Sequence, residues 1–282
     1  MKKILLLGCL LMFPRFAQAV DIVVGQTHLV IPAPADFVPV TSDMKVYVDF
    51  ANRFVPPTNE QFAQFLSSAD AALATRGDLP VAKRKFYVQT AKEIIQPLVS
   101  TADFEQLKSM IKTQNAELLK KVETEMPGLF EKVNQGISND FKVDVNLLMT
   151  QMLPLPPHDE SERTLSYSMI LKYNVNGADG KPVPFEGVVT ATFVHVKGKV
   201  LFLYANAEKS GLEWSRVESK KWAAMVVAAN PSAGNVAVEE ARPQRSGIDW
   251  SEVARKGLIG GIIGGIIGLI GYFTKKKPAK SA

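Results

Sequence analysis

Residues 185–207 read FEGVVTATFVHVKGKVLFLYANA, and this stretch decides the fold class. Lys197-Gly198 lies between two runs of apolar, β-branched and aromatic residues, which is typical of a two-residue β-hairpin turn. In the second run both alternating faces are apolar: Leu201, Leu203 and Ala205 on one, and Val200, Phe202 and Tyr204 on the other. Since successive side chains of a strand point to opposite faces, we predict a central strand that is covered on both sides.

Helical spacing occurs earlier in the sequence than this hairpin. Residues 101–122 place apolar side chains three or four positions apart, so we predict one long helix there. Pro127-Gly128 should end that pattern, because proline breaks a helix from within. We expect a shorter helix over residues 129–137 and then a change to strand-like alternation from 141 to 147.

A further strand is expected over residues 164–175, and a last helix of the domain over residues 212–229. Together the elements predict an α+β fold, in which an antiparallel sheet has flanking helices. One C-terminal transmembrane helix is expected in addition.

The C-terminal half of this arrangement resembles a known family. Its strands end in VLFLYANA at residues 200–207, and the following helix carries ESKKWAAMVVAANP at residues 218–231. This order of elements is similar to that of PsbP/DcrB-like periplasmic domains, over residues 20–231 at most. The resemblance implies a role in binding or assembly rather than catalysis, and it assigns no functional residue.

The N-terminus is typical of a secretory signal peptide. Two lysines precede an apolar run, and Ala17-Gln18-Ala19 forms a small-x-small cleavage site. We therefore predict a signal peptide over residues 1–19 and an exported, periplasmic domain over residues 20–230. Residues 231–248 are rich in small, polar and proline residues, so we expect a flexible linker there.

The only cysteine, Cys9, lies within the predicted signal peptide. Its neighbours Leu6-Leu7-Gly8 resemble a lipoprotein cleavage box, although the apolar run continues past the cysteine. A chain cleaved after Ala19 has no thiol, which excludes disulfides, cysteine nucleophiles and cysteine metal ligands.

The net charge of +5 does not indicate a nucleic-acid partner. Two lysines lie in the predicted signal peptide and four in the last eight residues, so the exported body is close to neutral. We also do not expect a nucleic-acid partner because the domain is predicted to be exported. We interpret Lys83-Arg84-Lys85 as the solvated start of a strand.

An uncharged apolar segment, residues 257–273, lies close to the C-terminus. Its seventeen residues are at the short limit for crossing a bilayer, where about 20 are typical. With its flanks, we predict a transmembrane helix over residues 249–274 that begins at Asp249, and then a basic cytoplasmic tail over residues 275–282. The expected membrane-interface anchors are Trp250, Tyr272, Lys275, Lys276 and Lys277.

The signal peptide determines the predicted orientation, because the lysines and arginines on the two sides of this segment are nearly balanced. It sends the domain outward, and the later helix returns the chain to the cytoplasm. The prediction is a single-pass inner-membrane protein whose main domain is periplasmic and whose C-terminus is cytoplasmic.

Glycines recur every four residues in this segment, in two interleaved rows. In a helix both rows share one broad face, which lets another helix approach closely. We predict self-association in the membrane through this glycine zipper. Two alternatives stay open: a plain anchor, and a segment that lies on the membrane or inserts only when triggered. The expected association residues are Gly257, Gly260, Gly261, Gly264, Gly265 and Gly268.

No catalytic or cofactor motif is recognisable in the sequence. The histidines His28, His158 and His195 do not have the spacing of metal ligands on one element. His158-Asp159-Glu160 lacks the further ligands that a hard cation needs, and Gly177–Lys181 is too short for a phosphate-binding loop. We expect no cofactor, no metal site and no catalytic residue, although dispersed acids and histidines can assemble in space.

These patterns predict a non-enzymatic envelope protein that is held at the inner membrane, self-associates through its glycine-rich helix, and binds an envelope protein or a cell-wall component. The alternatives are an envelope hydrolase that uses acid and histidine residues, and a membrane-active, pore-forming oligomer. A cleft that joined a histidine to two carboxylates would favour the hydrolase.

Overall fold

A large antiparallel sheet forms the framework of the protein, as seen in a computed structural model of the 282-residue chain. The structure describes residues 18–113, 115–141, 146–176, 181–232 and 247–266. The strand order is β3-β4-β5-β10-β9-β8-β6, and β7 pairs with β8. The strands are β3 (Phe37–Pro39), β4 (Asn59–Ser67), β5 (Arg84–Ala91), β6 (Leu147–Pro154), β7 (Asp159–Glu160), β8 (Thr164–Asn176), β9 (Pro182–Val196) and β10 (Lys199–Glu208).

The hairpin predicted from residues 185–207 is confirmed as the pair β9 and β10. Val196 is the register partner of Lys199, and the turn residues Lys197 and Gly198 both have positive φ, 48° and 70°. Two positive φ angles are what a tight hairpin turn requires. The two faces of β10 belong to different core clusters, Leu201 to one and Phe202 to the other, so β10 is covered on both sides as predicted.

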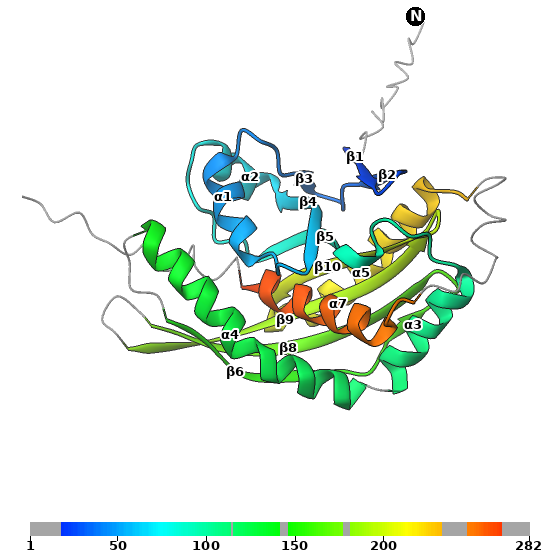
Figure 1. The fold of residues 1–282 in the computed structure, drawn as a ribbon. Coiled ribbons are helices and arrows are strands. Elements are labelled where there is room, and N and C mark those ends of the chain that lie inside the picture. Colours follow the sequence, from blue (N-terminus) through cyan, green and yellow to red (C-terminus); the bar gives the residue numbers. More distant parts are fainter. Residues whose placement is uncertain (1–17, 114, 142–145, 177–180, 233–246, 267–282) are drawn as a thin grey trace, which may run out of the picture.

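Helices cover both faces of the sheet. On one face lie α5 (Leu212–Ala229) and a separate hairpin of β1 (Ala19–Val24) and β2 (Thr27–Pro32). On the other lies α7 (Trp250–Gly265), with α3 (Thr101–Thr113) and α4 (Asn115–Phe141) packed against it. Figure 1 shows α7, coloured orange to red, in the middle of the molecule between the N-terminal elements and α4. The predicted α+β class with flanking helices is confirmed.

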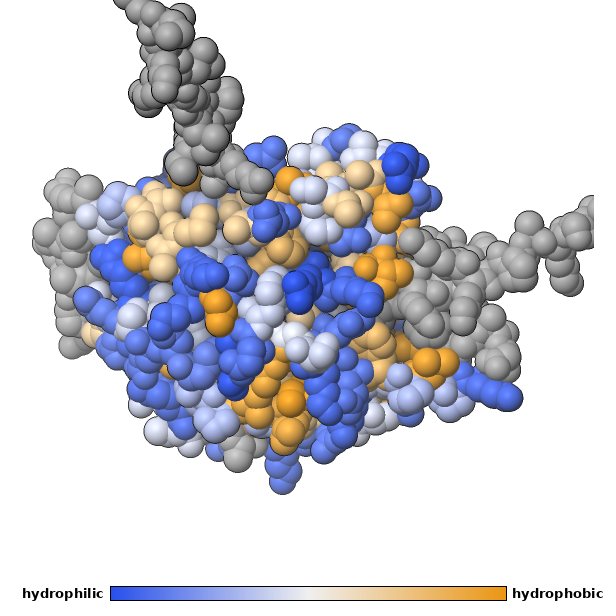
Figure 2. All heavy atoms as spheres, turned by 180° about the vertical axis from the view of Figure 1, so that it is seen from behind, coloured by the Kyte–Doolittle hydropathy of each residue, from blue (hydrophilic) through white to orange (hydrophobic). Residues whose placement is uncertain are grey.

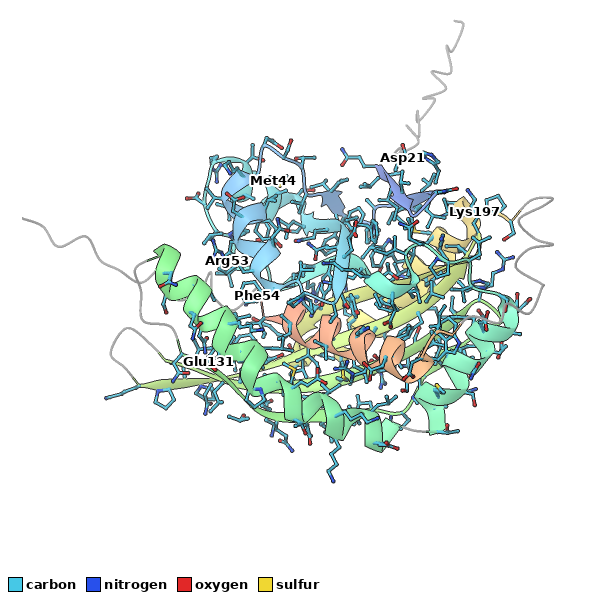
Figure 3. The ribbon with its side chains drawn as sticks, in the orientation of Figure 1. Asp21, Met44, Arg53, Phe54, Glu131 and Lys197 are labelled. Atoms are coloured by element: carbon cyan, nitrogen blue, oxygen red, sulfur yellow. The ribbon has the colours of Figure 1, made fainter. Side chains whose placement is uncertain are left out.

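Short helices complete the framework near the N-terminal strands. Figure 3 shows Arg53 near α4, where its Nη1 donates a hydrogen bond to the Gly136 carbonyl at 3.3 Å. This bond connects the N-terminal elements to α4. The short helices are α1 (Lys45–Ala51), the 3-10 turn η1 (Asn52–Phe54), α2 (Ser68–Thr75), and the 3-10 turns η2 (Lys92–Ile94) and η3 (Lys209–Gly211).

The prediction for residues 101–147 is wrong in three places. Two helices, α3 and α4, replace the single helix over 101–122; α4 does not end at Pro127; and its last residue, Phe141, is the expected first residue of a strand. Residues 142–145 of that expected strand lie outside the described part of the chain. Packing is the physical reason. Buried apolar side chains continue at helical spacing across the proline, and they outweigh its lost hydrogen bond: Leu118, Val122, Met126, Phe130, Val133 and Ile137.

The start of α7 is as predicted. The Asp249 side chain accepts hydrogen bonds from the main-chain N–H groups of Ser251 at 2.9 Å and Glu252 at 3.3 Å. Within the described ranges, no helix has both the length and the apolar character that crossing a membrane requires. The transmembrane helix over residues 249–274 stays a prediction, and its last eight residues lie outside the described part of the chain.

The rear face of the molecule is mainly hydrophilic. Figure 2 shows hydrophobic residues there in separate patches rather than in one continuous area. Scattered apolar residues of this kind are normal on a folded protein's surface and need no special explanation. This face therefore suggests no binding surface, and the candidate site is the buried environment of α7.

Candidate functional site

α7 lies in a groove whose floor is lined by aromatic side chains of the sheet. The stacked rings of Tyr87 in β5 and Tyr204 in β10 have centroids 4.7 Å apart, and Phe193 packs edge-on against Phe202 with centroids 5.0 Å apart. We call this floor the aromatic groove, and define it as Asn59, Tyr87, Gln89, Tyr173, Phe193, Phe202 and Tyr204.

Glycine is required where α7 meets the groove, because the helix backbone lies too close for a side chain. A Cβ atom added to Gly257 would lie 2.7 Å from Phe193 Cζ, and one added to Gly264 would overlap the ring and hydroxyl of Tyr87. Such contacts are shorter than real Cβ contacts. Packing within this chain therefore accounts for both glycine rows as far as Gly265. The same groove also faces Gly260, Gly261 and Gly265.

Four polar side chains of the groove donate hydrogen bonds to main-chain carbonyls of α7. The pairs are Tyr204 to Gly257 at 2.6 Å, Tyr87 to Gly260 at 3.2 Å and Gly261 at 3.1 Å, Tyr173 to Ile262 at 3.3 Å, and Asn59 to Lys256 at 3.0 Å. A carbonyl within a helix has a second lone pair, and glycine leaves it accessible. The groove thus recognises an uncovered helix backbone rather than a particular side chain.

The tyrosines of the groove stay donors at physiological pH. Burial raises the pKa of Tyr87, Tyr173 and Tyr204 well above the usual value of 10.0. Their hydroxyl groups are therefore protonated whenever the domain is folded, and each can hold its carbonyl partner on α7.

The opposite side of α7 is apolar and equally buried, against α3 and α4. Figure 3 shows side chains filling the space around this helix. An apolar surface all around a helix is typical either of a membrane span or of a helix inside a protein core, and α7 is enclosed by its own domain. The side chains away from the groove, all at most 3% exposed, are Val253, Leu258, Ile259, Ile262, Ile263 and Ile266.

Trp250, the expected membrane-interface anchor before the apolar segment, lies within the domain. Trp250 is 3% exposed and belongs to the core that surrounds α7. Lys256 forms an ion pair with Glu93 at the end of the groove, and Arg255 forms ion pairs with Glu252 and with Glu125 of α4. The pairs with Glu93 and Glu125 connect the N-terminal part of α7 to neighbouring elements, and the pair with Glu252 lies within α7.

Several predicted residues lie outside the described part of the chain. They include residues 1–17 of the predicted signal peptide and residues 233–246 of the predicted linker. Self-association through the glycine rows, and anchoring at a membrane interface, stay predictions. The individual site residues outside the described ranges are Gly268, Tyr272, Lys275, Lys276 and Lys277.

The structure does not bring the three histidines together. His28 lies in β2, His158 precedes β7, and His195 lies in β9 with its Nε2 2.8 Å from the Val99 carbonyl oxygen. Burial lowers the pKa of His158. Among the residues that the structure describes, no three His, Cys, Asp or Glu side chains are grouped closely enough to hold a metal ion.

The interpretation of Lys83-Arg84-Lys85 as solvated is wrong for its last residue. Lys85 is 2% exposed, and within the described ranges its Nζ has no hydrogen-bond partner. It shares the α7 face of β5 with Tyr87, because strand residues two apart point the same way. Arg84 points to the other face, where its guanidinium stacks 4.5 Å from the centroid of the Trp214 ring.

Sequence reasoning did not identify the aromatic groove. Its tyrosines could be recognised only as apolar residues of strands, because a single sequence does not show that β5 pairs with β10. One signal in the sequence could have pointed to it. A tyrosine predicted to lie in the core still has a hydroxyl group, and a buried tyrosine hydroxyl usually has a hydrogen-bond partner.

Comparison with known proteins gives a likeness in fold only. No family model matches the chain, and no curated protein matches its sequence. Among solved structures, the solution structure of cyanobacterial PsbP (CyanoP) from Synechocystis sp. PCC 6803 is similar, with 11% sequence identity and a TM-score of 0.26. The match covers 81% of this chain and 99% of that chain. The expected resemblance to PsbP-like domains is confirmed as a weak resemblance at the level of the fold.

Proposed function

We propose that this protein is a non-enzymatic binding and assembly protein of the cell envelope, and that the aromatic groove is its recognition surface for a glycine-rich helix. In the folded chain the groove holds the chain's own α7. In the assembled state it holds the α7 of a second copy, so that the copies are linked by exchanged helices.

One observation carries this proposal: the groove contacts the helix through its backbone. Tyrosine and asparagine side chains donate to main-chain carbonyls of α7, and the rings lie where a Cβ atom would otherwise be. A helix from another chain with glycines at the same spacing would offer the same carbonyls and the same absence of side chains. The groove is therefore selective for a small-residue helix, and it does not require that the helix come from its own chain.

Exchange between copies requires no new contact. Each interaction between α7 and the groove is retained when the helix belongs to another chain, which is the basis of domain swapping. The sequence over residues 231–248 predicts a flexible linker, and 18 residues of that kind have a root-mean-square span of roughly 23 Å. Such a linker is long enough for α7 to reach a neighbouring molecule.

The proposal includes a location at the inner membrane with the groove on the periplasmic side. Docking in the groove and insertion in lipid are alternative positions of α7, because both remove the same isoleucine side chains from water. Lipid offers the glycine face no close contact unless another small-residue helix packs there. The groove offers that contact within the chain, so docking stores the helix until a partner or the membrane takes it.

Disulfide trapping between two differently tagged chains tests the exchange. Both carry Cys9→Ser, and one adds Gly265→Cys while the other adds Asn206→Cys. A Cβ atom at residue 265 would lie 2.9 Å from Asn206 Nδ2, which is two bonds beyond the Asn206 Cβ. The two Cβ atoms are therefore at most about 5.3 Å apart, close to the ~3.5–4.5 Å that a disulfide needs. Helix exchange predicts a covalent heterodimer when the chains are mixed and oxidised.

A matched control replaces Asn206→Cys by Val217→Cys on α5, which lies on the opposite face of the sheet and is 49% exposed. The heterodimer with Cys at 206 should form in at least fivefold higher yield than the one with Cys at 217. Equal yields, or no heterodimer while the doubly substituted single chain closes its own disulfide, would show that α7 is a permanent part of its own domain. The proposal would then be wrong.

The other two functions are less well supported. Among the residues that the structure describes, no observation favours the hydrolase, because His28, His158 and His195 lie in separate parts of the fold. The pore-forming oligomer shares its first step, the release of α7 from the groove, with the function proposed above. It is therefore tested by preventing that release.

A further inference from the structure

The described part of α7 ends beside a cavity of about 310 Å³. Gly265 of α7 lines this cavity, together with Leu171 of β8, Gly187 of β9 and Asn206 of β10. Ile266, the last described residue, is fully buried and keeps helical backbone angles, with φ −75° and ψ −25°. The helix therefore shows no change of direction where the cavity begins.

The close contacts of α7 advance along β10 in regular steps toward this cavity. A Cβ atom added to Gly261 would lie 3.0 Å from Tyr204, and one added to Gly265 would lie 2.9 Å from Asn206. Four residues of a helix rise about 6 Å, and two residues of a strand span about 6.6 Å. The next step of four helix residues therefore falls at Glu208, which lines the cavity.

The groove widens at this step because β9 has a glycine there. Val189 lies 3.4 Å from a Cβ atom added to Gly261, so its side chain forms a close wall. Gly187 is the next residue on the same face of β9, because strand residues two apart point the same way. It has no side chain to form such a wall, and a Cβ atom added to it would have no neighbour closer than 3.6 Å.

The sequence of the apolar segment changes at the same step. The row of Gly257, Gly261 and Gly265 continues, four residues on, with Leu269. Glycine thus stands where the groove is tight, and a large apolar residue follows where it widens. Leu269 is three residues beyond Ile266, a separation of at most about 11 Å along the chain. It is therefore attached close to an apolar cavity that can remove its side chain from water.

We propose that docked α7 continues as a helix to Leu269, and that this cavity is the binding position for the Leu269 side chain. The occupant is the C-terminal segment that is joined to α7. The groove then selects a helix in which glycines four residues apart are followed, after four more residues, by a large apolar residue. The inference rests on the recognition of α7 by the aromatic groove, but not on exchange between copies.

Thiol labelling at residue 269 tests this position. Full chains with Cys9→Ser carry either Leu269→Cys or, in the predicted basic tail, Lys280→Cys. Each labelling rate with a thiol-specific maleimide is divided by the rate of the same chain unfolded in urea, which corrects for intrinsic reactivity. A thiol enclosed in the cavity reacts only when the segment leaves it. We expect the Leu269→Cys chain to react at least tenfold more slowly than the Lys280→Cys chain.

A substitution in the cavity wall assigns this protection to the cavity. Gly187→Val adds a side chain inside it, and should raise the labelling rate of the Leu269→Cys chain at least fivefold. Gly247→Val makes the same change where an added Cβ atom has nothing within 4 Å, and should leave the rate unchanged. Val183→Trp fills the cavity from a position that is 37% exposed, and replaces Gly187→Val if circular dichroism shows that the latter does not fold.

Two results would overturn the inference. Equal labelling of the Leu269→Cys and Lys280→Cys chains would show that residue 269 is not enclosed. Protection that persisted in a folded chain with Gly187→Val or Val183→Trp would show that residue 269 is enclosed elsewhere. Neither result depends on helix exchange, which the disulfide trapping between two chains measures separately, so either proposal can fail while the other holds.

Discussion

The same residue type has opposite roles in two helices of this protein. Gly264 of α7 lies against Tyr87, where an added Cβ atom would overlap the ring, whereas Gly128 of α4 is exposed and has nothing within 4 Å of an added Cβ. Glycine in a helix interior is normally unfavourable, because its backbone loses more freedom on folding than alanine does. At Gly264 the close contact outweighs that cost, and at Gly128 no such contact exists.

Replacement of glycine by alanine should therefore change the stability of the protein in opposite directions at these two positions. Gly264→Ala should lower the free energy of unfolding by about 1–3 kcal/mol, the usual cost of overpacking. Gly128→Ala should raise it by about 0.5–1 kcal/mol. Urea denaturation followed by circular dichroism measures both values. If the Gly264→Ala chain were as stable as the Gly128→Ala chain, α7 would not pack as closely against Tyr87 as described here.

The buried amine of Lys85 should make stability depend on pH. Burial lowers its pKa well below the usual 10.5, so the unfolded chain binds more protons than the folded chain between those two values. The free energy of unfolding contributed by this group therefore rises as the pH increases toward 10.5. Lys85→Met removes the amine, and should stabilise the protein at pH 7 by about 1–3 kcal/mol, the cost of an unpartnered buried polar group.

Denaturation from pH 7 to 9.5 measures this difference. The advantage of Lys85→Met over the unsubstituted chain should shrink as the pH rises, and the buried tyrosines, being common to both chains, do not contribute to it. Lys83→Met is the control, because the Lys83 side chain is 68% exposed and its ion pair with Glu208 is a surface pair. An advantage of Lys85→Met that stayed constant over this pH range would contradict a depressed pKa at Lys85.

At the scale of elements, the limits of sequence reasoning are clear in α4 and α7. The β9–β10 hairpin and the cap at Asp249 were predictable, because each depends on residues that are neighbours in the sequence. The continuation of α4 through Pro127 depends on partners elsewhere in the chain, which local propensity does not include. The enclosure of α7 was not predictable for the same reason, since a membrane span and a buried helix have the same apolar surface.

Pro127 should be the weakest point of α4. A proline inside a helix removes one main-chain hydrogen bond and clashes with the preceding turn, at a cost of about 3 kcal/mol. Pro127→Ala should therefore raise the free energy of unfolding by about 1–3 kcal/mol. Pro157→Ala, in the loop before β7, should lower it by about 0.4–1 kcal/mol, since loop prolines restrict the unfolded chain. Destabilisation by Pro127→Ala in a denaturation experiment would mean that the proline is a required part of α4.

At the scale of the whole molecule, α7 connects the sheet to the two long helices on its side. Its glycine face contacts β5, β9 and β10, and its isoleucine face contacts α3 and α4. Release of α7 would expose both the aromatic groove and the apolar surfaces of α3 and α4. Such a change is costly in water, so we expect release only where a partner helix or a bilayer replaces the lost contacts.

A covalent lock on α7 tests whether membrane association requires its release. The chain with Cys9→Ser, Asn206→Cys and Gly265→Cys should close a disulfide that holds α7 in the groove when oxidised, and free it when reduced. We expect the reduced chain to sediment with anionic phosphatidylglycerol vesicles, which attract the lysines at the C-terminus, and the oxidised chain to do so at least fivefold less. Dye leakage from the same vesicles should follow the same order if the released helix forms pores. The chain with Asn206→Cys alone controls for the oxidant, because its vesicle binding should not change. Equal sedimentation of the oxidised and reduced chains would show that α7 stays docked at the membrane, and that its glycine rows serve the fold of the domain alone.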